Sequence, residues 1–225
     1  MGKSISLALV TFTFVGCLGI WVGGCQTPEQ KVEKLISKLQ NKNPKNRQSA
    51  EAALTKMGTI VVPALIQALQ NPKIRQRVVG VLAKIGEDAS DAVPALVQLL
   101  PDEDANVRAS AVWTLAKIGT TAVPALIQTL QSKNAQTRIS AAGILGQIET
   151  LDAAPALIQA LQDPDSRVRR EAALALGHIT AVEAVSALIQ LLQDGNEYVR
   201  FNVVSALKQI GTAEALKAAE EYELR

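Results

Sequence analysis

The stretch VPALVQLLPDEDANVRASAVWTLAKIG, residues 93–119, contains the pattern on which the fold depends. Pro94 stands where the first turn of a helix can accept a missing N–H, and apolar residues follow it at helical spacing. Pro101 to Asp104 then supply turn and capping residues, and a second apolar face runs from Val107 to Ile118 before Gly119. The stretch therefore predicts two short helices joined by a turn.

Variants of this unit recur from about residue 33 to the C-terminus. The first helix of each copy starts roughly 31 residues after the previous one, at Glu33, Pro63, Pro94, Pro124, Pro155 and Ser186. One arginine recurs in the second helix of every copy, at Arg47, Arg75, Arg108, Arg138, Arg169 and Arg200. Six copies at one period predict a solenoid of stacked helix pairs, and residues 213–225 predict a polar capping helix.

The unit resembles the HEAT-repeat family, in particular the short HEAT-like repeats of phycobilisome lyase subunits. The resemblance covers about residues 33–211 and rests on the PAL opening, the Asp/Asn turn, the V-R-x-x-A core of the second helix and the closing I-G. It implies an all-α, right-handed α-solenoid of about six helix pairs plus a C-terminal capping helix.

The resemblance also implies a ladder, in which a turn aspartate and the arginine six positions on tie adjacent repeats together. It assigns Asp102 with Arg108, Asp163 with Arg169, and Asp194 with Arg200. Asn41, Leu69 and Ser132 replace the aspartate in the other three copies, so we expect an incomplete ladder in the N-terminal half.

Composition argues against a nucleic-acid partner. The chain has 23 Lys and Arg against 21 Asp and Glu, a net charge of +2. A solenoid that binds nucleic acid would be expected to have a strongly basic stripe, whereas the repeated arginines here are matched in three copies by turn carboxylates. Aromatic residues make up 3% of the chain, which suits thin layers of packed helices.

The N-terminus predicts a targeting or anchoring segment. Lys3 is the only charged side chain in the first 25 residues, and Ile5 to Gly24 forms an apolar run. The run ends in VGGC, residues 22–25, which resembles the lipobox of bacterial lipoproteins. The resemblance implies cleavage after Gly24 and lipidation of Cys25, with a fatty acid such as palmitate. We thus divide the chain into a signal peptide (1–24), a lipidated cysteine with a short tether (25–32) and a HEAT-like repeat domain (33–225).

An uncleaved N-terminal anchor and an ordinary cleaved signal peptide remain alternatives. The apolar run is somewhat long for a signal peptide, and Val22 stands where a lipobox usually has Leu. A lipoprotein or an anchored chain would be held at a membrane of the bacterial cell envelope, facing the periplasm or the exterior. Gln26 favours the outer membrane, by resemblance to enterobacterial sorting rules.

The chain offers few residues for catalysis or metal binding. It has one histidine, no cysteine after Cys25 and no glycine-rich phosphate loop. His178 takes a position held by lysine or glutamine in the other copies, so we interpret it as a polar surface residue. We expect no catalytic residue, no metal and no cofactor. HEAT-like chains include a di-iron hydroxylase with repeated His-Glu pairs, which this sequence lacks.

Candidate protein-binding residues lie in the second helices, one and five positions after the repeated arginine. On a helical wheel these positions point away from the predicted core, so we place them on a concave surface. The large side chains there are Trp113, Ile139, Arg170, Leu174 and Phe201. Aromatic and arginine anchors are the usual composition of a binding hot spot. For Ile139 and Leu174, partial burial between neighbouring second helices is the alternative interpretation.

We therefore interpret the chain as a membrane-tethered, non-enzymatic scaffold. It would bind a protein partner on the concave face formed by its second helices, with the first helices on the convex side. The alternative is a lyase-like or other enzyme subunit that acts on a cofactor-bearing protein, which rests on analogy of fold. An exported chain would be in the wrong compartment for cytoplasmic pigment attachment.

Overall fold

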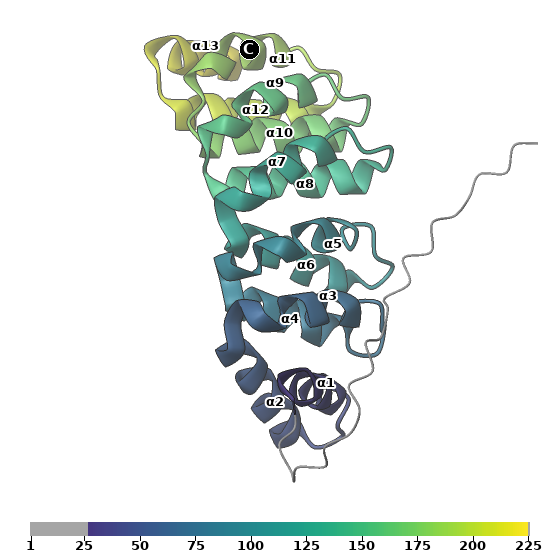
Figure 1. The fold of residues 1–225 in the computed structure, drawn as a ribbon. Coiled ribbons are helices and arrows are strands. Elements are labelled where there is room, and N and C mark those ends of the chain that lie inside the picture. Colours follow the sequence, from purple (N-terminus) through teal and green to yellow (C-terminus); the bar gives the residue numbers. More distant parts are fainter. Residues whose placement is uncertain (1–26, 225) are drawn as a thin grey trace, which may run out of the picture.

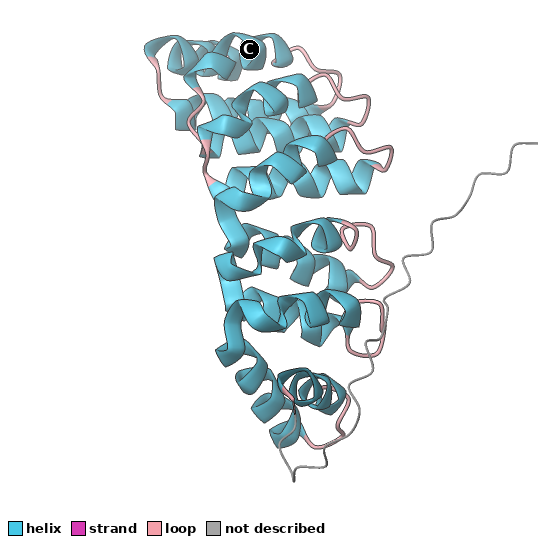
Figure 2. Ribbon diagram, in the orientation of Figure 1, coloured by secondary structure: helices cyan, strands magenta, loops and turns pink. Residues whose placement is uncertain are grey.

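The computed structural model describes residues 27–224, and helices and turns make up that whole range (Figures 1 and 2). The first helices of the six pairs are α1 (Pro28–Lys38), α3 (Val62–Ala68), α5 (Val93–Val97), α7 (Val123–Thr129), α9 (Ala154–Ala160) and α11 (Val185–Leu191). The second helices are α2 (Pro44–Met57), α4 (Arg75–Ile85), α6 (Ala105–Ile118), α8 (Ala135–Ile148), α10 (Ser166–His178) and α12 (Glu197–Ile210). A thirteenth helix, α13 (Ala213–Glu223), follows. The predicted all-α solenoid of six helix pairs and a C-terminal helix is confirmed.

The first helix begins earlier than the sequence analysis placed it. Thr27 and Gln30 form a capping box around Pro28, which takes a place in the first turn. Residues 28–32 therefore belong to α1, and the predicted tether ends before them. The predicted signal peptide and Cys25 lie outside the described residues.

Short polar side chains start most of the second helices. Asn43, Asp104, Asn134, Asp165 and Asn196 each accept a hydrogen bond from a backbone N–H in the first turn of the helix that follows. The turns that contain them lie along one edge of the solenoid (Figure 2). On the other side, short 3₁₀ segments lead from each second helix to the next first helix: η1 (Gly58–Val61), η2 (Gly86–Ala92), η3 (Gly119–Ala122), η4 (Leu151–Ala153) and η5 (Val182–Ala184).

One leucine from each helix of a pair fills the centre of most layers. These leucines are fully buried: Leu65, Leu96, Leu126, Leu157 and Leu188 from the first helices, and Leu54, Leu82, Leu115, Leu145, Leu176 and Leu207 from the second. Burial of one such side chain contributes about 1.5–3 kcal/mol. Because each layer shares its apolar residues with its neighbours, they form one continuous core from α1 to α13.

Two stretches, Pro44–Ala68 and Ala105–Thr129, are apolar and long enough to span a membrane by composition alone. Each runs through two helices of the solenoid, and the backbone breaks between them at Gly58 or Gly119, where φ is 61° or 76°. Both helices of each stretch contribute to the buried core. We therefore interpret the two stretches as core helices of the solenoid.

The second helices contact one another more extensively than the first helices do, which supports their predicted place on the concave side. Glycines allow the closest approach. A Cβ atom added at Gly146 of α8 would lie 2.9 Å from Cα of Ala175 in α10, and one added at Gly177 of α10 would lie 2.8 Å from Cα of Ala206 in α12. The backbones of α8, α10 and α12 thus pack directly against one another.

The junction between α6 and α8 is looser (Figure 1). Where α8 has Gly143 and Gly146, α6 has Trp113 and Ala116 at the corresponding positions. The methyl group of Ala116, at the position of Gly146, prevents the close backbone approach that glycine allows between α8 and α10. The solenoid therefore has a tightly packed C-terminal part and a weaker contact between its third and fourth repeats.

The arginine ladder is present, but it pairs different residues from those assigned by resemblance. The Asp163 carboxylate accepts hydrogen bonds from Arg138 of the preceding repeat, at 2.7 and 2.8 Å, rather than from Arg169. Arg169 instead donates to the Asp163 backbone carbonyl at 2.8 Å and pairs with Asp194 of the next repeat at 2.7 Å. Each arginine thus holds the turn of its own repeat and reaches forward to the next one.

The same correction applies to the other two assigned pairs. Asp102 pairs with Arg75 at 2.7 Å, while Arg108 donates to the Asp102 carbonyl, also at 2.7 Å. Arg200 donates to the Asp194 carbonyl at 2.7 Å. Its Nε bonds to the Tyr222 hydroxyl of α13 at 2.8 Å, because α13 has no aspartate turn to offer.

Two rungs of the ladder are missing from residues 27–224. The resemblance placed the gaps in the first, second and fourth copies, but Arg75 and Arg138 of the second and fourth copies pair with Asp102 and Asp163. Arg47 and Arg108 bond to backbone carbonyls of their own turns and to no carboxylate in that range. The residues that correspond to the forward aspartate are Leu69 and Ser132. The turn before α4 is also two residues shorter than the others, and α4 has no side-chain cap at Ile74.

The ladder shifts the pKa of its carboxylates. The hydrogen bond from Arg169 lowers the pKa of Asp194, against the opposing effect of burial. Burial acts to raise the pKa of Asp163, but hydrogen bonds from Arg138 and the Asp165 amide outweigh it, so this pKa is also lowered. Because both pKa values are depressed in the folded chain, these groups stabilise the fold above the unfolded pKa of about 3.9, and that stabilisation is lost as the pH falls through the folded values.

Two glycine substitutions should change stability in opposite directions. Gly177→Ala should lower the free energy of unfolding by about 1–3 kcal/mol, because the new methyl group would force the backbones of α10 and α12 apart. Gly80→Ala in α4 should raise it by about 0.5–1 kcal/mol, because no atom lies within 4 Å of the added Cβ and alanine favours the helix. Urea unfolding followed by circular dichroism measures both; a stabilising Gly177→Ala would contradict the packing described.

Ser132→Asp should restore one missing rung. The hydroxyl of Ser132 already accepts from the Asn134 N–H, as the turn aspartates do at their own positions. A carboxylate there would face Arg108, and we expect about 1 kcal/mol of added stability against urea. Gln131→Asp, one residue earlier and exposed, is the matched control for added charge. Equal effects of the two substitutions would show that Arg108 does not reach the turn.

Candidate protein-binding surface

The positions singled out on the helical wheel have different surroundings in different repeats. A Cβ atom added at Gly143, five residues after Arg138, would lie 2.8 Å from Oε1 of Glu171 in α10. Gly146 and Gly177, eight residues after their arginines, likewise face the next second helix. Position eight therefore faces the neighbouring repeat, and so does position five in α8, whereas no atom lies within 4 Å of a Cβ added at Gly80, the position-five residue of α4. A helical wheel treats one helix at a time and so does not contain the contact between Gly143 and Glu171.

Trp113 remains accessible because it lies at the loose junction. Its side chain is 52% exposed, and the ammonium group of Lys117 lies 5.5 Å from the centroid of its ring. The two residues line a groove of about 440 Å³ with Ala116 of α6, Gly146, Gln147 and Glu149 at the end of α8, and His178 of α10. A half-exposed indole beside polar groups from three repeats can contact an apolar side chain and offer hydrogen bonds around it.

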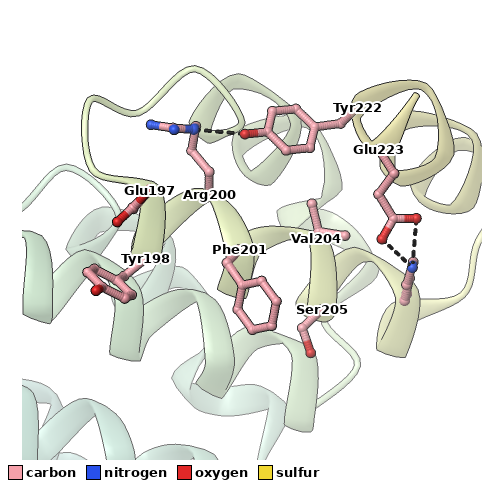
Figure 3. A pocket seen from close by; sticks show the side chains of 9 residues that line it. Glu197, Tyr198, Arg200, Phe201, Val204, Ser205, Tyr222 and Glu223 are labelled. Carbon is pink, nitrogen blue, oxygen red and sulfur yellow. Dashed lines mark hydrogen bonds and ion pairs between the residues drawn. The ribbon is translucent and has the colours of Figure 1, made fainter. Parts of the chain in front are cut away.

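Phe201 lines a separate groove at the C-terminal end of the solenoid (Figure 3). The groove has a volume of about 730 Å³ between α12 and α13 and is mainly apolar at its centre. Phe201 is 73% exposed and Tyr198 is 64% exposed. The two grooves share no lining residue.

The three other candidate residues are less accessible. Ile139 is half-buried and packs against the core, and Leu174 is also half-buried. Arg170 is half-buried beside Glu171. Burial raises the pKa of Glu171, and Arg170 and His178 act in the opposite direction. The structure thus favours the packing interpretation for Ile139 and leaves Trp113 and Phe201 as the large exposed side chains of the predicted set.

His178 is exposed on the second-helix surface, as the sequence analysis expected of a polar surface residue. The structure brings it into the Trp113 groove, which the sequence analysis did not predict. In residues 27–224 no group of three histidine, cysteine or acidic side chains is arranged to hold a metal ion.

The sequence analysis missed Tyr198 and Tyr222, which line the Phe201 groove. The distribution of aromatic residues along the sequence could have indicated these two tyrosines. Four aromatic residues follow Cys25, and three of them, Tyr198, Phe201 and Tyr222, belong to the last repeat and α13. Aromatic residues gathered at one end of an otherwise aliphatic solenoid indicate that this end differs from the regular stacking surfaces.

Comparison with known structures agrees with the fold. A chain of the Kap95p–RanGDP structure gives a TM-score of 0.55 at 17% identity, over 81% of this chain and 30% of that one. The phycocyanin lyase complex of CpcE and CpcF from Nostoc sp. PCC7120 gives 0.42 at 27% identity, over 91% and 84%. Human deoxyhypusine hydroxylase gives 0.45 at 20% identity, over 81% and 96%. Of these three, the first bears on the fold, and on the fold alone.

Comparison with curated protein sequences gave no match. The family model for HEAT repeats matches three ranges, residues 62–126, 123–195 and 181–222. Together these ranges cover more than half of the chain and contain both the arginine ladder and the Trp113 groove. The chain therefore belongs to the HEAT-repeat family.

Proposed function

We propose that this chain is a membrane-tethered, non-enzymatic scaffold that binds a protein partner through the second-helix surface of its solenoid. The observation that carries the proposal is Trp113, a large aromatic side chain held 52% exposed in a groove to which three repeats contribute. Tryptophan is one of the residue types enriched among the side chains that dominate the binding energy of protein interfaces.

The repeat architecture supports this proposal. A solenoid presents an extended surface whose shape is set by many repeats while a few side chains supply most of the affinity. At the Trp113 groove, Lys117, Gln147 and Glu149 surround the indole with donors and acceptors. A segment of a partner that places an apolar side chain against Trp113 could satisfy its own polar backbone groups on these neighbours.

The proposed tether rests on the sequence. The lipobox-like residues 22–25 come two residues before Thr27, which caps α1. A lipid on Cys25 would therefore hold the first repeat close to the bilayer surface, with the solenoid extending from it. One acyl chain gives weak membrane binding and stable anchoring needs more than one, as lipoprotein processing at such a cysteine would provide.

Trp113→Ala should weaken partner binding strongly while the fold is retained. A hot-spot tryptophan contributes about 2 kcal/mol or more, so we expect capture of the partner to fall at least about 30-fold. The measurement is quantitative mass spectrometry of proteins captured from detergent-solubilised membranes by the wild type and by Trp113→Ala. Circular dichroism checks the fold of each variant.

Two control variants accompany the capture experiment with Trp113→Ala. Ile60→Ala removes an apolar side chain of η1 that is 73% exposed, more than Trp113, and that lies outside the groove. His178→Ala removes the imidazole inside the groove. Capture that survives Trp113→Ala would overturn the proposed site. An activity lost in His178→Ala with capture intact would overturn the non-enzymatic role.

Labelling with a fatty-acid analogue tests the tether. Cys25→Ser should abolish labelling and release the chain from membranes, because the acyl acceptor is removed. Cys17→Ser is the matched control and should label like the wild type. Labelling that persists in Cys25→Ser, or that is absent from the wild type, would contradict lipidation and favour an uncleaved anchor.

A further inference from the structure

The Phe201 groove is a repeat-stacking surface. Ser205 and Lys208 of α12 stand five and eight residues after Arg200, as Gly143 and Gly146 stand after Arg138 in α8. In α8 these positions pack against α10. Beyond α12 the chain supplies α13 in the place of a seventh first helix, and no second helix follows α13 up to residue 224. Within residues 27–224 no second helix covers this face of α12, and Phe201 on it is 73% exposed.

The walls of the groove are fixed by contacts between α12 and α13. Arg200 Nε donates to the Tyr222 hydroxyl at 2.8 Å, and Figure 3 shows this bond joining the two helices. Lys208 Nζ contacts both carboxylate oxygens of Glu223, at 2.6 and 2.9 Å. The groove is therefore formed before anything binds in it, which lowers the ordering cost of association.

The face of α12 in this groove is complementary to itself. Glu197, Phe201, Val204 and Lys208 follow one another at spacings of four, three and four residues and so form one stripe along the helix. The stripe has an acidic end, an apolar centre and a basic end. Val204 is only 8% exposed and belongs to the core, so Phe201 supplies the exposed part of the centre. If a second α12 lies antiparallel on the first, Glu197 faces Lys208 of the other copy at both ends and the Phe201 rings of the two copies lie at the centre.

We propose that this face of α12 is a two-fold interface between two copies of the chain. A two-fold interface uses the same patch on both copies. Because the stripe is acidic at one end and basic at the other, two antiparallel stripes place opposite charges together at both ends. The helix of the second copy lies where a seventh second helix would stack. The proposal goes beyond the partner-binding function, which uses the Trp113 groove and shares no residue with this face.

The existing Lys208–Glu223 contact does not prevent the pairing. Both side chains are about half exposed, so the contact is a surface ion pair of small net stability. An ammonium group has three N–H donors, and Glu223 occupies two of them. Because one helix face is smaller than the roughly 800 Å² per partner of a standard interface, we expect a weak dimer that depends on concentration.

The test is sedimentation velocity of the full chain in a non-ionic detergent across a concentration series. The wild type should shift from monomer to dimer as concentration rises. Phe201→Ala should weaken dimerisation at least about tenfold, because the apolar centre is lost. Ile60→Ala is the matched control, with the same exposed fraction of 73%, and should dimerise like the wild type. Trp113→Ala should also dimerise normally, which separates this interface from the partner-binding site.

Charge reversal tests the antiparallel order. Glu197→Lys and Lys208→Glu should each abolish the dimer, because like charges then meet at both ends. Mixing the two variants in equal amounts should restore it, since every end contact in the mixed pair joins opposite charges. The charge-reversal experiment remains informative even if the Phe201→Ala variant does not fold.

Three outcomes would overturn the proposal. The wild type could remain monomeric at every concentration, the dimer could persist unchanged in a folded Phe201→Ala variant, or the mixed charge variants could stay monomeric. A photo-crosslinking residue at position 201 identifies the occupant directly. It should join to α12 of a second copy, and a crosslink to another protein or to lipid would assign the face to that occupant instead.

Discussion

The fold depends on the repeated arginine of the second helices, which makes two kinds of contact in each complete rung. In each complete rung, a guanidinium group binds backbone carbonyls of its own turn and the carboxylate of the next turn, as Arg169 does with Asp163 and Asp194. The carbonyl contact fixes the start of the second helix, and the carboxylate contact fixes the next repeat relative to it. Because a planar guanidinium has five donors, it can do both at once where lysine could not.

The candidate binding surface lies where this constraint is weakest. Arg108 has no forward carboxylate within residues 27–224, and at the same junction α6 carries Trp113 where α8 carries Gly143. The missing ion pair, together with alanine rather than glycine at position 116, favours a wider contact between the third and fourth repeats. The widening in turn leaves the indole accessible. Loss of regularity and gain of an exposed aromatic side chain are thus two aspects of one local change in sequence.

Local patterns predicted the elements of this fold well, because each cause is local. The apolar spacing of residues 93–119, the Asp104 cap and the Gly119 stop all act within a few residues, and all appear in the structure. The sequence analysis was wrong about relations between repeats. The carboxylate partner of Arg138 lies 25 residues onward in Asp163, and the face of Gly143 is set by α10. Such relations depend on the offset between stacked layers, which a helical wheel does not contain. The capping box at Thr27 was a local signal that the sequence analysis overlooked.

Within residues 27–224 the two outermost second helices, α2 and α12, differ in the side chains on their outer faces. The exposed side chains of α2 include short, polar or charged ones such as Ser49 and Lys56. At the other end α13 covers only the first-helix side, and its Tyr222 takes the forward contact of Arg200 that an aspartate takes elsewhere. The second-helix side keeps apolar side chains at the stacking positions, with Phe201 and Tyr198 largely exposed. A polar residue at position 201 would suit this face of α12 to water, whereas phenylalanine makes it a surface on which helix packing is favourable.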